Sequence, residues 1–106
     1  MKLNLYTKNF DLKEVENEYL EEKVEKIKKY SLVQEDQILS IKIEKDVKHE
    51  NGEDVYTMSV DLNVKGKDIH IEKSGNNVFA VIDMCEEVLT SEIRQYKDIL
   101  TNNKRK

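Results

Sequence analysis

The clearest pattern in the chain is a change of hydrophobic period at Ser74-Gly75-Asn76-Asn77. Before this segment apolar residues alternate with polar ones, as in a half-buried strand, and after it they recur at steps of three and four, as on one face of a helix. The alternating residues are Tyr56, Met58, Val60, Leu62, Val64, Ile69 and Ile71, and the helical stripe is Val78, Ile82, Cys85, Leu89, Ile93, Tyr96 and Leu100. The sequence therefore predicts strands that lead directly into a C-terminal helix.

Glycine and asparagine residues mark the expected turns in the C-terminal half of the chain. Lys65-Gly66-Lys67 leaves so few residues before the strand over 68–73 that only a tight antiparallel hairpin fits. Asn51-Gly52 lies in the polar stretch 46–54 and predicts a second hairpin loop, because these residues accept positive φ. We expect Ser74, Gly75 and Asn76 to cap the last helix, which should run to about Leu100.

The N-terminal half predicts a strand, a helix and another strand. Leu3 and Leu5 alternate with polar neighbours over residues 2–6, and residues 12–30 are rich in Glu and Lys without Gly or Pro. Asp11 is the expected N-cap of this helix, with Glu14 at the capping-box position. The apolar residues near helical spacing are Val15, Tyr19, Leu20, Val24, Ile27 and Tyr30, and those expected to face inward from the second strand are Leu39, Ile41 and Ile43.

The resulting order is β-α-β-β-β-α, which defines an α+β domain. A strand-helix-strand crossover makes the first two strands parallel, and the hairpins extend the mixed four-stranded sheet in the antiparallel sense. Both helices should pack on one face, as in double-stranded-RNA-binding domains, while polar residues leave the other face open. These polar residues are Asn4, Lys42, Glu44, Ser59, Asp61, Asn63 and His70. We expect one domain over residues 1–101 and a basic polar tail over 102–106.

Composition narrows the class of protein. The chain has 106 residues, 38% hydrophobic and 38% charged, with a formal net charge of -4. No apolar run approaches the ~20 residues of a membrane span, and the N-terminal sequence lacks the apolar segment of a signal peptide, so cytoplasmic residence is expected. The net charge argues against a nucleic-acid partner, although the distribution of charge matters more than its sum.

The sequence contains no pattern typical of an active site. Cys85, the only cysteine, lies on the apolar stripe of the last helix and is expected to be a small buried hydrophobe rather than a catalytic thiol. His49 and His70 have no second ligand at a spacing that suits a metal. The chain has no phosphate-loop glycine motif and no recognisable catalytic triad. We therefore expect no catalytic residues, metal or cofactor.

Basic residues cluster in the second half of the first predicted helix, at Lys23, Lys26, Lys28 and Lys29. One explanation is electrostatic, because acids near the start of a helix and bases near its end complement the macrodipole. The alternative is a contact with phosphate groups, favoured by Lys23, which lies within the apolar arc where a purely structural helix would place an apolar residue. Both explanations remain open at this point.

A second basic group lies at the end of the chain. Arg94 and Lys97 are one turn apart on the last helix, and Lys104-Arg105-Lys106 follow. Terminal basic residues commonly serve solubility alone. Arg94 and Lys97 are stronger candidates because a helix fixes their direction.

Read together, four segments resemble the ribosome hibernation-promoting factors and ribosome-associated translation inhibitors: 1–5, 22–30, 66–71 and 76–83. The resemblance extends from Met1 to about Leu100 and includes the order of elements. Longer members of this family continue into a C-terminal dimerisation domain, so the chain resembles a short form.

The resemblance implies a non-enzymatic factor that binds the small ribosomal subunit in the channel for messenger RNA and tRNA, and so inhibits translation on idle ribosomes in stationary phase or starvation. It implies contacts with ribosomal RNA phosphates, and no DNA, membrane, small-molecule substrate or cofactor. Lys23, Lys26, Arg94 and Lys97 match basic positions of the family, and Lys28 and Lys29 extend the group. Departures from the family pattern occur at Glu16, Asn17, Val88 and Ser91.

A second hypothesis is a diverged protein-interaction module with the same fold and weakened RNA binding, which pairs through the exposed sheet face or an open sheet edge. The acidic residues Glu86, Glu87 and Glu92 of the last helix favour it. A continuous basic strip would favour RNA, whereas an interruption by Glu86 or Glu92 would favour the module. The double change of Lys23→Glu with Lys26→Glu is expected to abolish ribosome association and leave thermal stability nearly unchanged.

Overall fold

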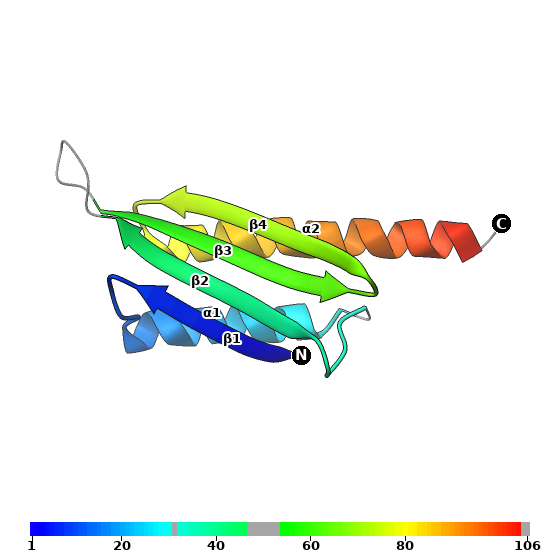
Figure 1. The fold of residues 1–106 in the computed structure, drawn as a ribbon, viewed down its shortest axis with the longest axis horizontal. Helices are drawn as coiled ribbons and strands as arrows, with labels where there is room; N and C mark the ends of the chain where they lie inside the picture. Colours follow the sequence, from blue (N-terminus) through cyan, green and yellow to red (C-terminus); the bar gives the residue numbers. More distant parts are fainter. Residues whose placement is uncertain (31, 47–53, 105–106) are drawn as a thin grey trace.

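The computed structural model describes residues 1–30, 32–46 and 54–104 (Figure 1). Its elements, in order, are β1 (Lys2–Lys8), α1 (Glu14–Lys28), β2 (Ile38–Asp46), β3 (Val55–Val64), β4 (Lys67–Gly75) and α2 (Val78–Lys104). This order confirms the predicted β-α-β-β-β-α arrangement. Asn51-Gly52 and its predicted hairpin turn lie outside the described residues.

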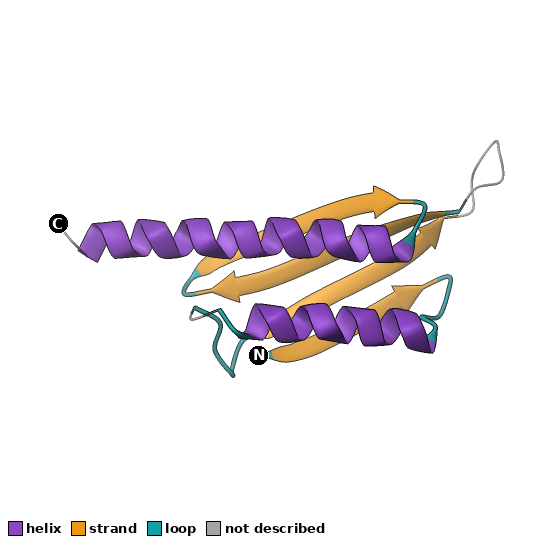
Figure 2. Ribbon diagram, turned by 180° about the vertical axis from the view of Figure 1, so that it is seen from behind, coloured by secondary structure: helices purple, strands orange, loops and turns teal. Residues whose placement is uncertain are grey.

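The four strands form one mixed sheet in the order β1-β2-β3-β4. β1 pairs parallel with β2, and the two following pairs are antiparallel, as the crossover and the hairpins predicted. Figure 2 shows α1 and α2 side by side on the same face of the sheet. Both helices begin at the same end of the domain, and α2 extends well beyond the sheet at the other end (Figures 1 and 2).

The core lies between the sheet and the two helices. The predicted inward positions of β2, β3 and β4 are buried, apart from Tyr56, which is half-buried. The helices contribute Leu20, Val24, Ile27, Val78, Val81, Ile82, Cys85, Leu89 and Ile93. Val15, assigned to the apolar stripe of α1, is 59% exposed. Five residues correspond to about 140° around an α-helix, so Val15 projects away from the stripe that contains Leu20.

Both predicted helix caps were wrong by one or two residues. Lys13, not Asp11, is the N-cap of α1, and its backbone N–H donates to Glu16 Oε1 at 2.8 Å. In α2 the capping group is Asn77 Oδ1, which accepts the N–H groups of Phe79 and Ala80 at 2.8 and 3.3 Å. The cap falls at Asn77 because β4 continues through Gly75. α2 itself ends at Lys104 rather than near Leu100, so it includes part of the predicted tail.

The predicted tight turn between β3 and β4 is confirmed. Lys65 and Gly66 have φ angles of 52° and 85°, so both occupy the left-handed region that two-residue hairpin turns of type I′ require. Gly66 adopts this conformation without the steric cost that a side chain would add. The turn fixes the register in which Val64 pairs with Lys67.

The open face of the sheet is polar, as predicted, and its side chains pair across β3 and β4. The pairs are Thr57 with Ser74 at 2.9 Å, Ser59 with Glu72 at 3.4 Å, Asp61 with His70 at 2.6 Å and Asn63 with Asp68 at 2.7 Å. Cross-strand polar pairs of this kind stabilise a sheet without a second layer. This half of the face therefore needs no covering element.

Candidate functional site

The two helices are joined by a small polar network. The Tyr19 hydroxyl of α1 donates a hydrogen bond to Asp83 Oδ1 of α2, and Lys23 Nζ lies 3.4 Å from the same oxygen. The Lys23 ammonium also lies 5.1 Å from the centre of the Tyr19 ring, which in turn packs edge-on against Phe79. Sequence reasoning missed Asp83, although a single acid among Val81, Ile82 and other apolar residues was a visible signal.

This network determines the environment of Lys23. The Lys23 side chain is only 17% exposed. Burial alone lowers the pKa of Lys23, but the hydrogen bond to Asp83 and the charges of Asp83 and Glu86 outweigh it, so the net pKa is raised. The hydrogen bond to Asp83 likewise raises the pKa of Tyr19. Lys23 therefore stays charged at neutral pH, with its charge directed at α2.

The sequence-based expectation that changing Lys23 to Glu leaves stability nearly unchanged does not fit these contacts. We predict instead that Lys23→Glu lowers the free energy of unfolding by about 1 to 2 kcal/mol, because it replaces an attraction to Asp83 by a repulsion and removes the cation–π contact. Asp83 is 45% exposed, and solvent screening keeps the effect modest. Urea unfolding measures this change. The matched control is Lys26→Glu, an exposed position on the same helix, for which a change within about 0.5 kcal/mol is expected. Equal effects at the two positions would contradict the structural role of Lys23.

Lys26 and Lys29 occupy a different position from Lys23. Both are exposed, and with Tyr30 and Glu86 they line a shallow groove between the end of α1 and α2. None of the ion pairs among the described residues involves either lysine. Tyr30, which the sequence placed on the apolar stripe, adds a half-buried ring to the groove. Two cations beside an aromatic ring favour an anionic, nucleotide-like ligand, whereas the Glu86 carboxylate in the same groove opposes one.

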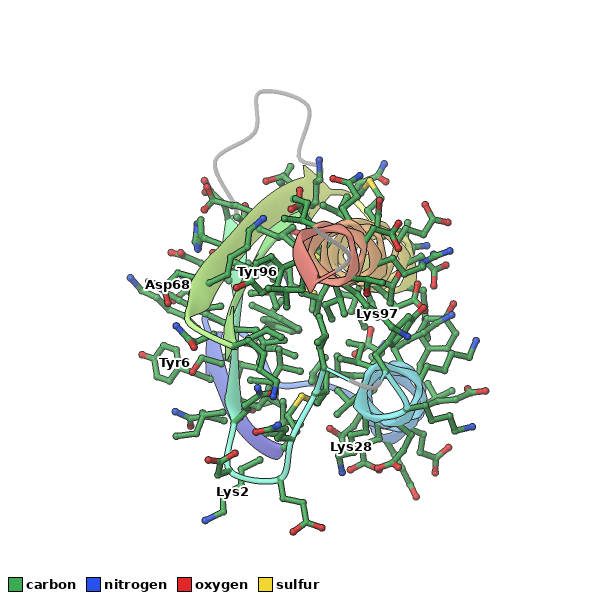
Figure 3. The ribbon with its side chains drawn as sticks, turned by 90° about the vertical axis from the view of Figure 1, so that its right-hand side faces the viewer. Lys2, Tyr6, Lys28, Asp68, Tyr96 and Lys97 are labelled. Atoms are coloured by element: carbon green, nitrogen blue, oxygen red, sulfur yellow. The ribbon has the colours of Figure 1, made fainter. Side chains whose placement is uncertain are left out.

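Lys28 does not belong to this surface. Its ammonium pairs with Glu25 at 2.9 Å, and its side chain lines another groove together with Leu3 of β1. Figure 3 shows Lys97 between α1 and α2, and Lys28 on the flank of α1 away from α2. Of the four lysines that the sequence proposed on the first helix, the structure therefore leaves only Lys26 and Lys29 exposed without an ion-pair partner among the described residues.

Arg94 and Lys97 lie on the C-terminal half of α2. Both are exposed, and no ion pair in the described part of the chain neutralises either of them. Lys97 follows Glu86 by three helical turns, so it lies on the flank of α2 that faces α1, as Figure 3 also shows. We call Lys26, Lys29, Arg94 and Lys97 the helix-layer cations.

The acidic residues of α2 are divided between two sides. Glu92 reaches Lys67 of β4 at 3.8 Å, on the side of α2 away from α1. Glu86, in contrast, lines the groove with Lys26 and Lys29. Glu86 therefore interrupts the basic surface, as one of the two predicted positions, whereas Glu92 does not.

Metal ligands, membrane crossing and the single cysteine complete the description of the site. Among the described residues no group of histidine, cysteine and carboxylate side chains is arranged to hold a metal ion. None of the helices in that part of the chain has the length and apolar character needed to cross a membrane. Cys85 is buried, 1% exposed, which confirms the predicted small hydrophobic role, and burial raises the pKa of its thiol from 9.0 to about 11.

From the raised pKa of the Cys85 thiol we predict that the protein loses stability at alkaline pH. The unfolded chain loses the thiol proton near pH 9, whereas the folded chain keeps it to about pH 11. The contribution of the buried, protonated thiol to the free energy of unfolding is therefore fully present below pH 9. It falls by about 2 to 3 kcal/mol between pH 9 and about pH 11. Urea unfolding from pH 8 to 10.5 should show a steeper decline for the natural chain than for Cys85→Ala. Parallel declines would contradict this prediction.

Comparison with known proteins places the chain in a family. The family described as "Sigma 54 modulation protein / S30EA ribosomal protein" matches residues 3–101, so the chain belongs to it. A "Ribosome hibernation promotion factor" of Deinococcus radiodurans is 31% identical over 91 residues, which is 85% of this chain and 46% of that protein. The chain thus spans about half the length of this curated relative.

Solved structures show the same fold. A ribosomal subunit interface protein from Coxiella burnetii superposes with a TM-score of 0.71 at 13% identity, covering 92% of this chain and 99% of that one. The N-terminal domain of Thermus thermophilus Protein Y gives a TM-score of 0.69 at 12% identity, with coverage of 91% and 99%. At these identities the likeness establishes the fold alone.

Proposed function

We propose that this protein is a ribosome hibernation factor that binds the small ribosomal subunit in the channel for messenger RNA and tRNA and inhibits translation by idle ribosomes. The family and the name of the Deinococcus radiodurans relative support an association with the ribosome. The observation that carries the proposal is the exposure of the helix-layer cations on a chain whose net charge is -4. These four charges lack ion-pair partners among the described residues, so they are available to phosphate groups.

The proposed mechanism is occupancy rather than chemistry. Lys26 of α1, Lys29 at the C-cap of α1, and Arg94 and Lys97 of α2 bind phosphates of folded ribosomal RNA. These contacts position the domain by shape rather than by base sequence. Four phosphate contacts correspond to a slope of log affinity against log salt of about -3 to -4. Lys23 supports this surface indirectly, because it joins α1 to α2 through Asp83.

A translation assay tests the functional part of the proposal. Adding the protein to a cell-free system with limiting small subunits should inhibit synthesis, with saturation near one molecule per subunit. Subunits already loaded with messenger RNA and tRNA should be resistant, because the channel is occupied. Binding to subunits without inhibition, or equal inhibition of loaded subunits, would contradict the proposed place of binding.

A second candidate is the protein-interaction module of the same fold. The position of Glu86 between Lys26, Lys29 and Lys23 favours it, because a carboxylate in the groove repels phosphate. Replacing Glu86 by Gln distinguishes the two functions. RNA-directed binding should strengthen by several-fold, whereas binding to a protein through this groove should weaken or stay unchanged.

A further inference from the structure

The β1 edge of the sheet is open. β1 pairs only with β2, and Figure 1 shows it as the outermost strand of the sheet. The Lys2 N–H donates to the Gln37 carbonyl at 2.7 Å, so the backbone groups of Lys2 and every second residue after it face β2. Those of Leu3, Leu5 and Thr7 therefore face outward. Outside the ladder that joins β1 to β2, no backbone hydrogen bond among the described residues involves these three.

A groove lies beside the start of this edge, between Leu3 of β1 and α1. It is lined by Leu3, Glu18, Glu21, Glu22, Val24, Glu25 and Lys28. Leu3 is 37% exposed and Val24 is buried, so the groove has an apolar component below a rim of carboxylates. An open strand edge with an adjacent groove is the geometry to which extended peptides bind as an additional strand.

The charge of the groove indicates what binds there. Four glutamates line it against one lysine, and that lysine is already paired with Glu25. Glu21 accepts a hydrogen bond from Asn17 at 3.2 Å, while Glu18 and Glu22 are exposed and form no ion pair within the described part of the chain. An RNA would be repelled from this groove, and a cationic peptide would be attracted to it.

We propose that the β1 edge binds an extended basic segment of a partner protein, which adds a strand to the sheet beside β1 and places Lys or Arg side chains against the glutamates of α1. This surface is distinct from the helix-layer cations, and the inference does not depend on the proposed function. A molecule with both surfaces can bind RNA and a basic protein segment at the same time.

The strand geometry specifies the pattern of the segment. Side chains of an added strand point alternately to the helix side and to the open face of the sheet. On the helix side they meet the glutamates, whereas on the open face they approach Lys2 and Lys8, both exposed. The segment should therefore carry basic residues at every second position and neutral residues between them.

Hydrogen exchange measured by NMR tests this proposal with a synthetic peptide of about seven residues in which Lys alternates with Thr. In the free protein the amides of Leu3, Leu5 and Thr7 should exchange fast, and those of Asn4 and Tyr6 slowly. At saturating peptide the three outward amides should become protected by at least about tenfold. Binding without protection of these amides would mean mere charge attraction and would overturn the proposal. Protection that rises with protein concentration alone would assign the edge to a second copy of the chain and overturn it as well.

Two variants sharpen the test. Glu18→Gln with Glu22→Gln should weaken peptide binding about tenfold, as expected for two exposed charge pairs. The matched control is Glu87→Gln with Asp98→Asn, which makes the same change in net charge on α2 and should leave binding unchanged. A peptide of the same composition with its lysines in one block should bind more weakly than the alternating one. Equal losses in both variants, or equal binding of both peptides, would contradict a defined groove.

Discussion

Replacing both Lys26 and Lys29 by glutamate should weaken binding to small ribosomal subunits by about a hundredfold at 0.1 M salt. The change removes two of the four helix-layer cations and adds two charges that repel phosphate. The slope of log affinity against log salt should fall by about half. Sedimentation binding at several salt concentrations measures both quantities. Stability should be nearly unaffected, because both side chains are exposed and neither forms an ion pair among the described residues.

The matched control for this variant lies on the opposite side of the molecule. Lys2 and Lys42 are exposed lysines on the open face of the sheet, away from the helices. Lys2→Glu with Lys42→Glu makes the same change in net charge. If this pair weakens binding as much as the pair on α1, binding depends on overall charge and the helix-layer cations are not the site.

Leu89→Ala should lower the free energy of unfolding by about 3 to 4 kcal/mol. Leu89 is 1% exposed and lies where α2 packs over the sheet, near Leu20 of α1 and Ile41 of β2. Its truncation removes buried apolar surface and leaves a cavity among side chains of α1, α2 and the sheet. Because small domains are stabilised by about 5 to 15 kcal/mol in total, the loss should be visible in both urea and thermal unfolding.

Ile99→Ala provides the comparison on the same helix. Ile99 is 52% exposed and lies in the last two turns of α2. The same kind of truncation should cost less than about 1 kcal/mol there. Similar losses at Leu89 and Ile99 would mean that the end of α2 is packed in solution and would contradict the described burial.

Most of the fold could be predicted because its elements have strong periodic patterns. The alternation of Met58, Val60 and Leu62 fixes which face of β3 is buried, and a shift of one residue would expose all of them. The boundaries were less predictable, because capping depends on where the preceding element ends. Asn77 caps α2 since β4 continues to Gly75, and the local sequence around Ser74 did not reveal this.

The sequence predicted which basic residues are candidates for the site, but it did not predict which of them lie together on one exposed surface. Helical spacing placed Lys23 within an apolar arc, and the structure shows the reason, which is the carboxylate of Asp83 about sixty residues later in the chain. Such a contact depends on how two helices pack, which no local pattern encodes. The pairing of Lys28 with Glu25 has the i, i+3 spacing that the sequence does display, so it was in principle recognisable.

The most direct test of the proposed function is co-sedimentation of the purified chain with small ribosomal subunits across a salt series. Saturable binding near one molecule per subunit, weakening with salt along a slope of about -3 to -4, is the predicted result. Absence of binding even at low salt would contradict the assignment as a ribosome-binding factor and would favour the protein-interaction module.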